Sequence, residues 1–226
     1  MSSVDITVVA DAEEAARLVA ERLAEQARAG GSIVLTGGST PRRAYELAAG
    51  LEPDWSRVEV WWGDERCVPP DDGRSNYGMA KAALLDLLKV SPAAVHRIRG
   101  ELGPDAGADA YEEEIGNRGA WDLQLLGLGP DGHVASLFPG FPALEEYGRN
   151  AVGTEAGLEP FVDRITLTIP RIRGSNELLF LVAGADKADA VARAFAPEPS
   201  ELPGRQARAW NDRTYAVLDR AAAANL

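Results

Sequence analysis

Hydrophobic and polar residues follow two different rhythms along the chain. Short runs rich in Val, Ile, Leu and Trp recur from one end to the other, and longer stretches between them carry apolar residues every three or four positions. The short runs predict buried strands, and the longer stretches predict helices with one apolar face. Strands are expected at residues 6–9, 32–35, 58–62, 123–128, 164–169, 178–182 and 214–218.

Local signals mark where several helices begin. Asp11 is a suitable N-cap for the first helix, and Pro41 fits the first turn of the second. Asn76 is expected to cap a third helix, which would carry leucines at its end. Two further helices are expected at residues 105–115 and 185–195.

The order of the elements predicts the fold class. Strands that alternate with helices are typical of α/β proteins, in which helices cover both faces of a mainly parallel sheet. The chain has no internal repeat, and its proline-rich stretch 196–204 is expected to be a loop, so residues 1–226 are expected to form one domain. Ligands bind such sheets outside the carboxyl ends of the strands. The loops that follow strands are therefore the places to look for chemistry.

The charge balance limits the possible partners. The chain has 23 basic and 35 acidic residues, which give a formal net charge of −12. This balance argues against a broad nucleic-acid-binding surface. An anionic substrate would need a local group of arginines and lysines that offsets the overall negative field.

The compartment is predicted from cysteine usage and from the N-terminal segment. Cys67 is the single cysteine, so no internal disulfide is possible and a reducing compartment is expected. The N-terminus lacks the basic segment and apolar core of a secretory signal. No apolar run approaches the ~20 residues that span a bilayer. We expect a cytoplasmic protein without membrane association.

The first candidate loop follows the strand at 32–35. Its glycines allow the backbone to approach a ligand closely, and the amides at the start of the next helix favour an anion. No lysine follows the glycines at the spacing of a Walker loop. An ordinary strand-to-helix turn fits the same residues, so the loop alone leaves both interpretations open. The candidate residues are Gly37, Gly38, Ser39 and Thr40.

The second candidate loop, residues 63–75, follows the strand at 58–62 and is rich in charge. Arg66 and Arg74 are suited to bidentate phosphate contacts. Asp64 or Glu65 is suited to orient a catalytic group or to bond a sugar hydroxyl. The alternative is a solvated loop whose charges pair at little energetic value. That alternative is favoured for Asp71 and Asp72. A functional role is favoured for Asp64 and Arg66, which lie at the strand end.

The third candidate loop, residues 127–133, contains one of the two histidines of the chain. His133 follows a glycine turn and lies two residues after Asp131. A histidine in this position can take a proton from water, and a nearby carboxylate can fix its tautomer. His96 lies between Val95 and Arg97 without polar neighbours in the sequence. We expect His133 to be catalytic and His96 to be structural or exposed.

Two other kinds of site are not supported by the sequence. Two separated histidines and one cysteine do not make a usual zinc set, and no H-E-x-x-H segment occurs. Ser136 lacks the G-x-S-x-G segment of serine hydrolases and is expected to be a hydroxyl at the start of a helix. Neither a metal site nor a covalent catalytic triad is expected.

The three loops together resemble the 6-phosphogluconolactonase family. The matching segments are LTGGSTPRRAYELAA, WWGDERCVPPDDGRSNYGMA and LLGLGPDGHVASLFPG, and weaker similarity continues through TLTIPRI, LLFLVAGADKADAV, LPGRQ and WNDRTYAVLDRAAA. The resemblance covers nearly the whole chain, and DGHVASLFPG is its most specific part. It implies the Rossmann-like sugar-phosphate isomerase/deaminase fold and a phosphorylated sugar lactone as the substrate.

The resemblance also implies a role for each candidate residue. His133 would activate water for attack on the lactone carbonyl, and Asp131, or Asp64 across the pocket, would orient it. The glycine loop would line the pocket near the phosphate. The phosphate would be bound by Arg66, Arg171 and Lys187, with Arg74 as a weaker candidate. Such chemistry needs no metal or cofactor, and a monomer is expected.

Two alternatives remain at this point. Related glucosamine-6-phosphate deaminases continue the D-G-H turn to a glutamate, whereas this chain has Phe138, and they have D-E-Y where it has Asp64-Glu65-Arg66. Both departures favour the lactonase. A non-catalytic sugar-phosphate sensor would be expected to lack the histidine and to carry a DNA-binding segment.

Overall fold

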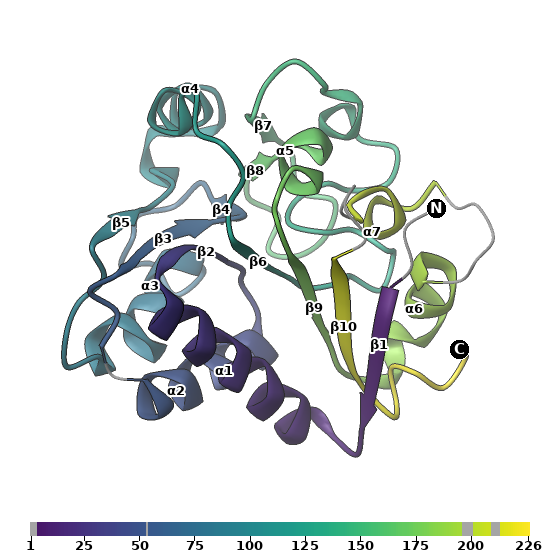
Figure 1. Ribbon diagram of the computed structural model, residues 1–226. Helices are drawn as coiled ribbons and strands as arrows, with labels where there is room; N and C mark the ends of the chain where they lie inside the picture. Colours follow the sequence, from purple (N-terminus) through teal and green to yellow (C-terminus); the bar gives the residue numbers. More distant parts are fainter. Residues whose placement is uncertain (1–3, 53, 196–200, 209–212) are drawn as a thin grey trace.

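A seven-stranded sheet forms the centre of the computed structural model, which describes residues 4–52, 54–195, 201–208 and 213–226. Its strand order is β1-β10-β9-β6-β2-β3-β5, and every neighbouring pair is parallel (Figure 1). The predicted parallel sheet is therefore confirmed. The strands are β1 (Val4–Val9), β2 (Gly31–Leu35), β3 (Val58–Trp62), β5 (Ala94–His96), β6 (Leu123–Leu126), β9 (Leu178–Val182) and β10 (Thr214–Asp219).

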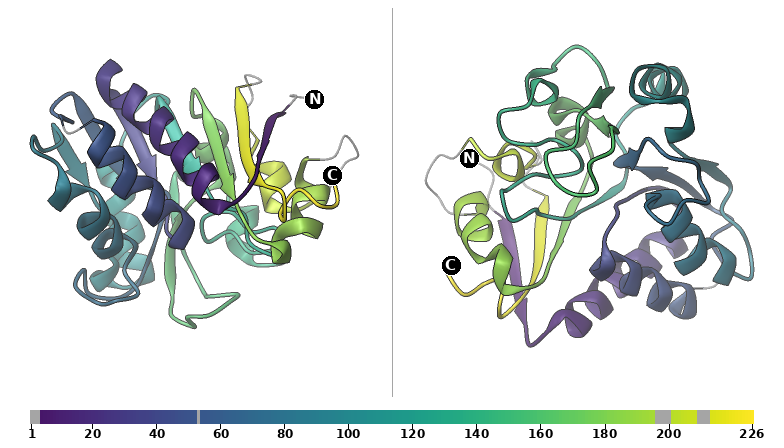
Figure 2. Two further views of the ribbon diagram at one scale, coloured as in Figure 1. Left: turned by 90° about the horizontal axis from the view of Figure 1, so that it is seen from below. Right: turned by 180° about the vertical axis from the view of Figure 1, so that it is seen from behind.

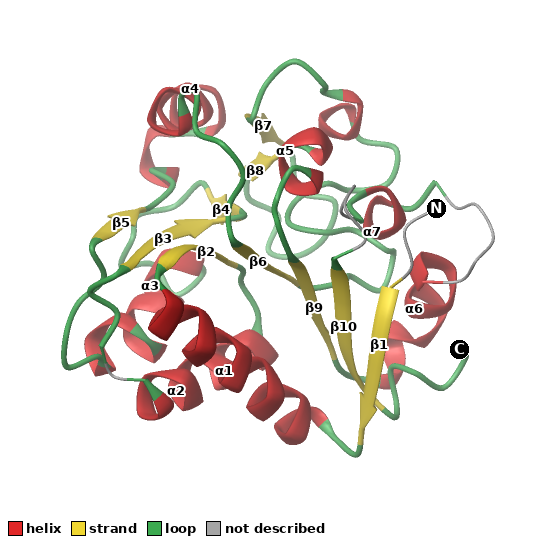
Figure 3. Cartoon of the chain, in the orientation of Figure 1, coloured by secondary structure: helices red, strands yellow, loops and turns green. Residues whose placement is uncertain are grey.

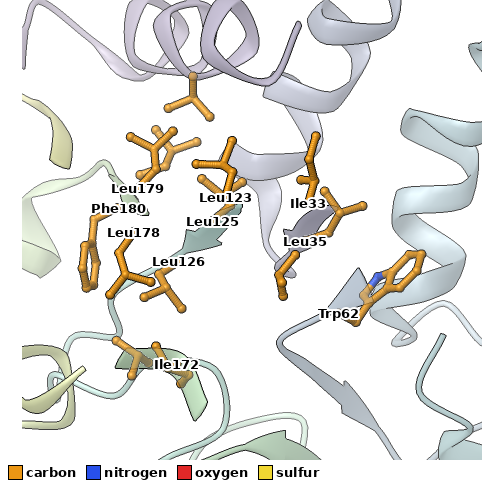
Figure 4. Close-up of a cluster of buried hydrophobic side chains, with 14 of the residues drawn as sticks. Ile33, Leu35, Trp62, Leu123, Leu125, Leu126, Ile172, Leu178, Leu179 and Phe180 are labelled. Atoms are coloured by element: carbon orange, nitrogen blue, oxygen red, sulfur yellow. The ribbon is translucent and has the colours of Figure 1, made fainter. Parts of the chain in front are cut away.

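The central strands are apolar because both of their faces are covered. All residues of β6 and β9, and all of β2 except Gly31, are buried. A strand buried on both faces has a continuous apolar run in place of alternation, as in the LLFLV segment of β9. Figure 4 shows how side chains of these strands, including Ile33, Leu125 and Phe180, fill the core.

Helices lie on both faces of this sheet, as predicted. Asp11 caps the first helix, because its side chain accepts a hydrogen bond from the amide of Glu14 at 2.9 Å. In Figure 2, α1 and α6 lie on opposite sides of the strands. None of the helices in the described parts of the chain has the length and apolarity that a membrane crossing needs. The helices are α1 (Ala12–Ala29), α2 (Ser39–Leu51), α3 (Asn76–Ala83), α4 (Pro104–Ile115), α5 (Ile169–Arg173), α6 (Ala188–Phe195) and α7 (Pro203–Gln206).

A small antiparallel sheet was not predicted from the sequence. It has the order β4-β8-β7 and consists of β4 (Asp64–Arg66), β8 (Arg164–Leu167) and β7 (Ala151–Thr154). The expected loop at 63–75 therefore begins with a strand, and the expected strand at 164–169 lies outside the parallel sheet. Gly63 joins the two sheets, since its amide donates to Leu35 and its carbonyl accepts from Leu167, both at 2.9 Å.

Several predicted boundaries shift. The second helix begins at Ser39, two residues before Pro41. The N-cap of α3 is Ser75, whose hydroxyl accepts from the amide of Gly78, so Asn76 is the first helical residue and its side chain is free for another contact. The connection from β6 to β7 contains little regular structure beyond the short 3-10 helix Pro142–Glu145 (Figure 3). Of the predicted loop at 196–204, residues 196–200 lie outside the described part, and α7 occupies its end.

The strand order predicts where a ligand binds. From β2 the chain continues to β3 and β5 on one side, whereas from β6 it continues to β9 and β10 on the other. The connections therefore diverge between the adjacent strands β2 and β6, and such a divergence opens a crevice at the carboxyl ends of the strands. The first and third candidate loops follow these two strands.

Candidate active site

A cavity of about 440 Å³ opens at the carboxyl ends of the central strands. Its size falls within the usual range for small-molecule sites. It brings together residues that the sequence spread over four loops. The predicted site residues that line it are Gly37, Gly38, Ser39, Thr40, Asp64, Arg66, His133 and Lys187.

The glycine loop at the start of α2 is held in place by its neighbours. The hydroxyl of Tyr45 accepts from the amide of Thr36 at 2.9 Å and donates to its carbonyl at 2.8 Å. A Cβ atom on Gly37 would lie 2.0 Å from Oδ1 of Asn76, so only glycine fits there. Gly38 has φ +119° and provides no side-chain cap for α2. The helix therefore presents its N-terminal amides, which favour an anion, towards the cavity.

His133 is oriented by Asp131. Nδ1 of His133 lies 2.6 Å from Oδ1 of Asp131, and the same oxygen accepts from the His133 amide at 3.1 Å. Burial opposes ionisation of Asp131, but the hydrogen bond and charge interaction with His133 outweigh it and lower the pKa of the Asp131 carboxyl. An ionised carboxylate can only accept, so Nδ1 carries the proton and Nε2 is left as the basic nitrogen.

The glycine turn makes this pairing possible. The amide of Gly129 donates to the carbonyl of His133 at 2.9 Å, which folds the loop back on itself. A Cβ atom on Gly129 would lie 1.9 Å from Nδ1 of His133, so any other residue would displace the imidazole. The centroid of the His133 ring lies 4.7 Å from the ring centroid of the buried Phe138.

Asp64 lines the cavity but is not the partner of His133. Its Oδ2 accepts from the hydroxyl of Ser136 at 2.7 Å, and its Oδ1 accepts from the side-chain amide of Asn76 at 3.0 Å. Of the two carboxylates expected as partners of His133, Asp131 is therefore the one that is bonded to it. Ser136 is not a helix-start hydroxyl either, because it lies in a turn and not at the start of a helix, where it is fully buried and donates to Asp64.

The cavity has more positive than negative side chains. Arg66 and Lys187 line it as predicted, and Arg164 joins them because β8 pairs with β4 so that Arg164 lies directly opposite Arg66. Burial, followed by the charge of Arg66, lowers the pKa of the Arg164 guanidinium. Among the described residues, the carboxylates that line it are Asp64 and Asp186. A local cationic excess thus exists within a chain of net charge −12.

Arg164 and Asn76 also line the cavity and were not predicted as site residues from the sequence. Arg164 donates to the carbonyls of Val162, Pro160 and, at 3.3 Å, Leu158, so it also anchors the chain before β8. Only the pairing of two short strands brings it to the cavity, and no local pattern reports that pairing. Asn76 is also a good helix-cap residue, so its position before a predicted helix gives no separate signal for a site.

Two predicted phosphate ligands lie elsewhere. Arg171 packs 3.6 Å over the ring of Trp121 and donates to the carbonyls of Arg118 and Gly119. Trp121 precedes β6, so Arg171 lies at the opposite end of that strand from His133. Arg74 is exposed and pairs with Asp72 at 2.7 Å. Its contribution to the site is its carbonyl, which accepts from Arg66 at 2.7 Å.

Most of the chain matches a known protein family. Residues 8–216 match the model of the glucosamine-6-phosphate isomerases/6-phosphogluconolactonase family. The chain belongs to this family. Among the described residues, no group of three His, Cys, Asp or Glu side chains is arranged to hold a metal ion.

Members of the isomerase/6-phosphogluconolactonase family resemble the chain over almost its whole length. The 6-phosphogluconolactonase of Streptomyces coelicolor is 39% identical over 94% of this chain and 88% of its own. That of Mycobacterium leprae is 38% identical over 99% of both chains. The solved 6-phosphogluconolactonase of Trypanosoma cruzi superposes with a TM-score of 0.89 at 30% identity, covering 100% of this chain and 98% of its own.

A solved monomeric glucosamine-6-phosphate deaminase has the same fold. It superposes with a TM-score of 0.86 over 99% of this chain and 100% of its own, but only 20% of the residues are identical. At that identity the likeness concerns the fold alone. The choice between the two activities therefore depends on the side chains in the cavity and on the more similar relatives.

Proposed function

We propose that this protein hydrolyses 6-phospho-D-glucono-1,5-lactone to 6-phosphogluconate, the lactone-hydrolysing step of the pentose phosphate pathway. The observation that carries the proposal is that a carboxylate-oriented histidine and three cations line one cavity: His133 with Arg66, Arg164 and Lys187. A base beside an anion-binding region is what hydrolysis of a phosphorylated ester requires. The curated relatives at 38–39% identity support this substrate.

His133 is the general base in this proposal. Nε2 takes a proton from water while the oxygen attacks the lactone carbonyl carbon. The tetrahedral intermediate then collapses as the bond from that carbon to the ring oxygen breaks, and the imidazolium returns its proton to the leaving oxygen. A well-placed base of this kind contributes about 10²- to 10⁴-fold. Asp131 holds the tautomer and stabilises the imidazolium.

The phosphate is held by the cations and by the start of α2. Arg66 is suited to a bidentate contact, while Lys187, 3.1 Å from Asp186, adds a point charge. Ser39 and Thr40 lie at the N-terminus of α2, where amides and hydroxyls favour the anion. Binding the phosphate at a distance from the carbonyl converts binding energy into orientation of the reacting atoms.

The oxyanion of the intermediate would be stabilised by backbone amides near the glycine turn. The amide of Gly129 is bonded to His133, and that of Gly132 is bonded to Gly129, so neither serves this purpose. Gly127 and Leu128 line the cavity and are the better candidates. One well-placed donor of this kind is worth about 3 kcal/mol.

The proposed reaction is tested by proton release from freshly generated 6-phosphogluconolactone, after subtraction of its spontaneous hydrolysis. We expect a large acceleration, and a much lower kcat/KM for the unphosphorylated lactone. Glucosamine 6-phosphate, tested for ammonia release, is expected to give none. Ammonia release, or hydrolysis no faster than background, would contradict the proposal.

We also propose that the enzyme acts as a monomer in the cytoplasm. His133, Asp131 and the cations of the cavity all belong to one chain, so the site needs no partner subunit. The single cysteine suits a reducing compartment. Sedimentation at enzyme concentrations that support full activity is expected to give the mass of one chain, 24.1 kDa.

A further inference from the structure

Asp64 is a buried carboxylate in the cavity for which the proposed reaction gives no role. Only 4% of the residue is exposed, yet it lines the cavity that holds His133. The two side-chain hydrogen bonds that it accepts from described residues come from neutral groups, the amide of Asn76 and the hydroxyl of Ser136. Removing a carboxylate from water is costly unless its acceptor positions are used. A further partner for Asp64 is therefore expected from inside the cavity.

The neighbouring Glu65 shows what a saturated carboxylate looks like in this fold. Its Oε1 accepts from the amides of Arg66 and Asn76, both at 2.7 Å. Its Oε2 accepts from the Tyr77 amide at 2.7 Å and the Ser75 hydroxyl at 2.9 Å. A carboxylate has about four acceptor positions, so Glu65 has none left, and it does not line the cavity.

Asp64, by contrast, keeps acceptor capacity on both oxygens. One donor on each oxygen fixes the plane of the carboxylate and leaves about two acceptor positions for a ligand. A negative charge also repels a phosphate, so this side of the cavity favours a neutral donor. The donors that a sugar lactone offers are its ring hydroxyls.

We propose that Asp64 accepts a hydrogen bond from a ring hydroxyl of the substrate, and that Asn76 and Ser136 position its carboxylate for that contact. This inference rests on the proposed function, because it requires a hydroxylated lactone in the cavity. Asp64 is then a specificity determinant that selects a sugar lactone over a lactone without hydroxyls. A site built to bond a hydroxyl discriminates against an analogue that lacks it, because the buried acceptor is left unpaired.

The positioning residues connect Asp64 to the rest of the site. Asn76 also donates to the main-chain carbonyl of Asp64 at 3.0 Å, and its Oδ1 lies against Gly37 of the glycine loop. Ser136 lies three residues after His133 in the same loop. The hydroxyl contact at Asp64 is thus fixed relative to both the phosphate-binding end and the base.

The test combines substrate analogues with an isosteric variant. Wild-type protein and Asp64→Asn are assayed with 6-phosphogluconolactone and with its 2-deoxy, 3-deoxy and 4-deoxy analogues. In the wild type, we expect one analogue to lose about 10- to 100-fold in kcat/KM, the usual worth of a hydrogen bond to a charged group. For Asp64→Asn, we expect kcat/KM for the parent lactone to fall by a similar factor. Removing the same hydroxyl from the substrate should then reduce kcat/KM of the variant little further, and the acid limb of the pH profile should not move.

The possible results separate this inference from the proposed function. If the wild type does not accelerate hydrolysis of the parent lactone, the proposed function fails and the inference fails with it. If it does, equal rates for all the deoxy analogues would overturn the role of Asp64 without any variant. The role of Asp64 would also be overturned if Asp64→Asn and the deoxy analogue each reduced kcat/KM and the two losses multiplied when combined. A shifted acid limb of the pH profile in Asp64→Asn would overturn it as well, because it would indicate an effect through His133.

Ser136→Ala provides a second variant that keeps the carboxylate. It removes one neutral donor from Oδ2 and is expected to raise KM several-fold while kcat changes less. It should also reduce the penalty for the same deoxy analogue that identifies the Asp64 contact. A purely structural role would lower the melting temperature without that change in analogue preference, and this result would overturn the positioning role.

Discussion

The chain has two histidines, and each bonds a carboxylate through Nδ1. His133 lies 2.6 Å from Asp131, and His96 lies 2.8 Å from Glu114. The two pairs are also almost equally exposed. The exposed fractions of the histidine and carboxylate side chains are 22% and 34% in the first pair and 23% and 33% in the second. Neither the pairing nor the burial distinguishes them.

Their surroundings differ. His133 follows β6 at the divergence of the sheet and faces a cavity with three cations, whereas His96 ends β5 at the edge of the sheet and stacks on Trp61 with a centroid distance of 3.8 Å. We call the second region the tryptophan cluster, and it consists of His96, Trp61, Trp121, Arg118 and Arg171. The comparison teaches that a histidine–carboxylate pair gains a function from where the fold places it.

The largest expected difference is between alanine substitutions of the two histidines. His133→Ala is expected to reduce kcat for lactone hydrolysis by about 10²- to 10⁴-fold, because it removes the base. His96→Ala is expected to keep kcat and KM and to lose about 1–2 kcal/mol of unfolding free energy with the ring stacking. Proton release and chemical denaturation measure the two effects. Full activity in His133→Ala would keep the reaction and refute the mechanism.

Substitutions of the two carboxylate partners, Asp131 and Glu114, should differ in their effect on kcat in the same direction, by a smaller factor. Asp131→Asn is expected to reduce kcat by about 10²-fold, because the tautomer and the imidazolium lose their support. Glu114→Gln is expected to leave kcat unchanged and to cost less than about 1 kcal/mol of stability, since the pair is partly exposed.

The pH profile provides an independent check of the Asp131 pair. The pKa of the Asp131 carboxyl is lowered, so this carboxylate stays charged as the pH falls towards the acid limb of the activity profile. Its negative charge stabilises a positive charge on its hydrogen-bond partner. Asp131→Asn should therefore move the acid limb to lower pH. A limb that stays in place would mean that Asp131 is not paired with the catalytic base during turnover.

Each of the two regions also contains an arginine: Arg66 in the cavity is expected to bind phosphate, and Arg171 in the tryptophan cluster is expected to stabilise the fold. Arg66→Met is expected to raise KM for the phosphorylated lactone by about 10- to 100-fold, because a charge-assisted contact to phosphate is lost. Arg171→Met is expected to leave KM unchanged. It should instead cost about 1–3 kcal/mol of stability with the Trp121 contact and two backbone hydrogen bonds. A raised KM in Arg171→Met would return this residue to the site.

Much of the fold and the centre of the site are predictable from local sequence. The apolar runs of the central strands identify a parallel sheet, and the rule for such sheets directs attention to the loops at their carboxyl ends. His133 and Asp131 are two residues apart in a glycine turn, so the sequence offers Asp131 as one of two partners, beside Asp64, and the hydrogen bond in the structure favours Asp131. The family resemblance was carried by these same loops.

The remaining site residues depend on long-range pairing. Arg164 reaches the cavity because three-residue β4 pairs with β8, and strands so short have no periodic signal. Ser136 and Asn76 are assigned by their contacts with Asp64, which lies 72 and 12 residues away in the sequence. The partner of His96, Glu114, lies 18 residues away, so sequence neighbours gave the wrong impression that this histidine had no polar partner.

The smallest expected effect is at Arg74, an arginine near the cavity whose side chain points to Asp72. Its carbonyl holds Arg66, and that contact survives any side-chain substitution. Arg74→Ala is therefore expected to change kcat and KM by less than about twofold, as exposed substitutions usually do. The matched variant is Arg66→Met, measured with the same phosphorylated lactone. If Arg74→Ala raised KM tenfold, the guanidinium of the wild type would have to leave Asp72 and contact the substrate, and Arg74 would belong with Arg66 among the phosphate-binding residues.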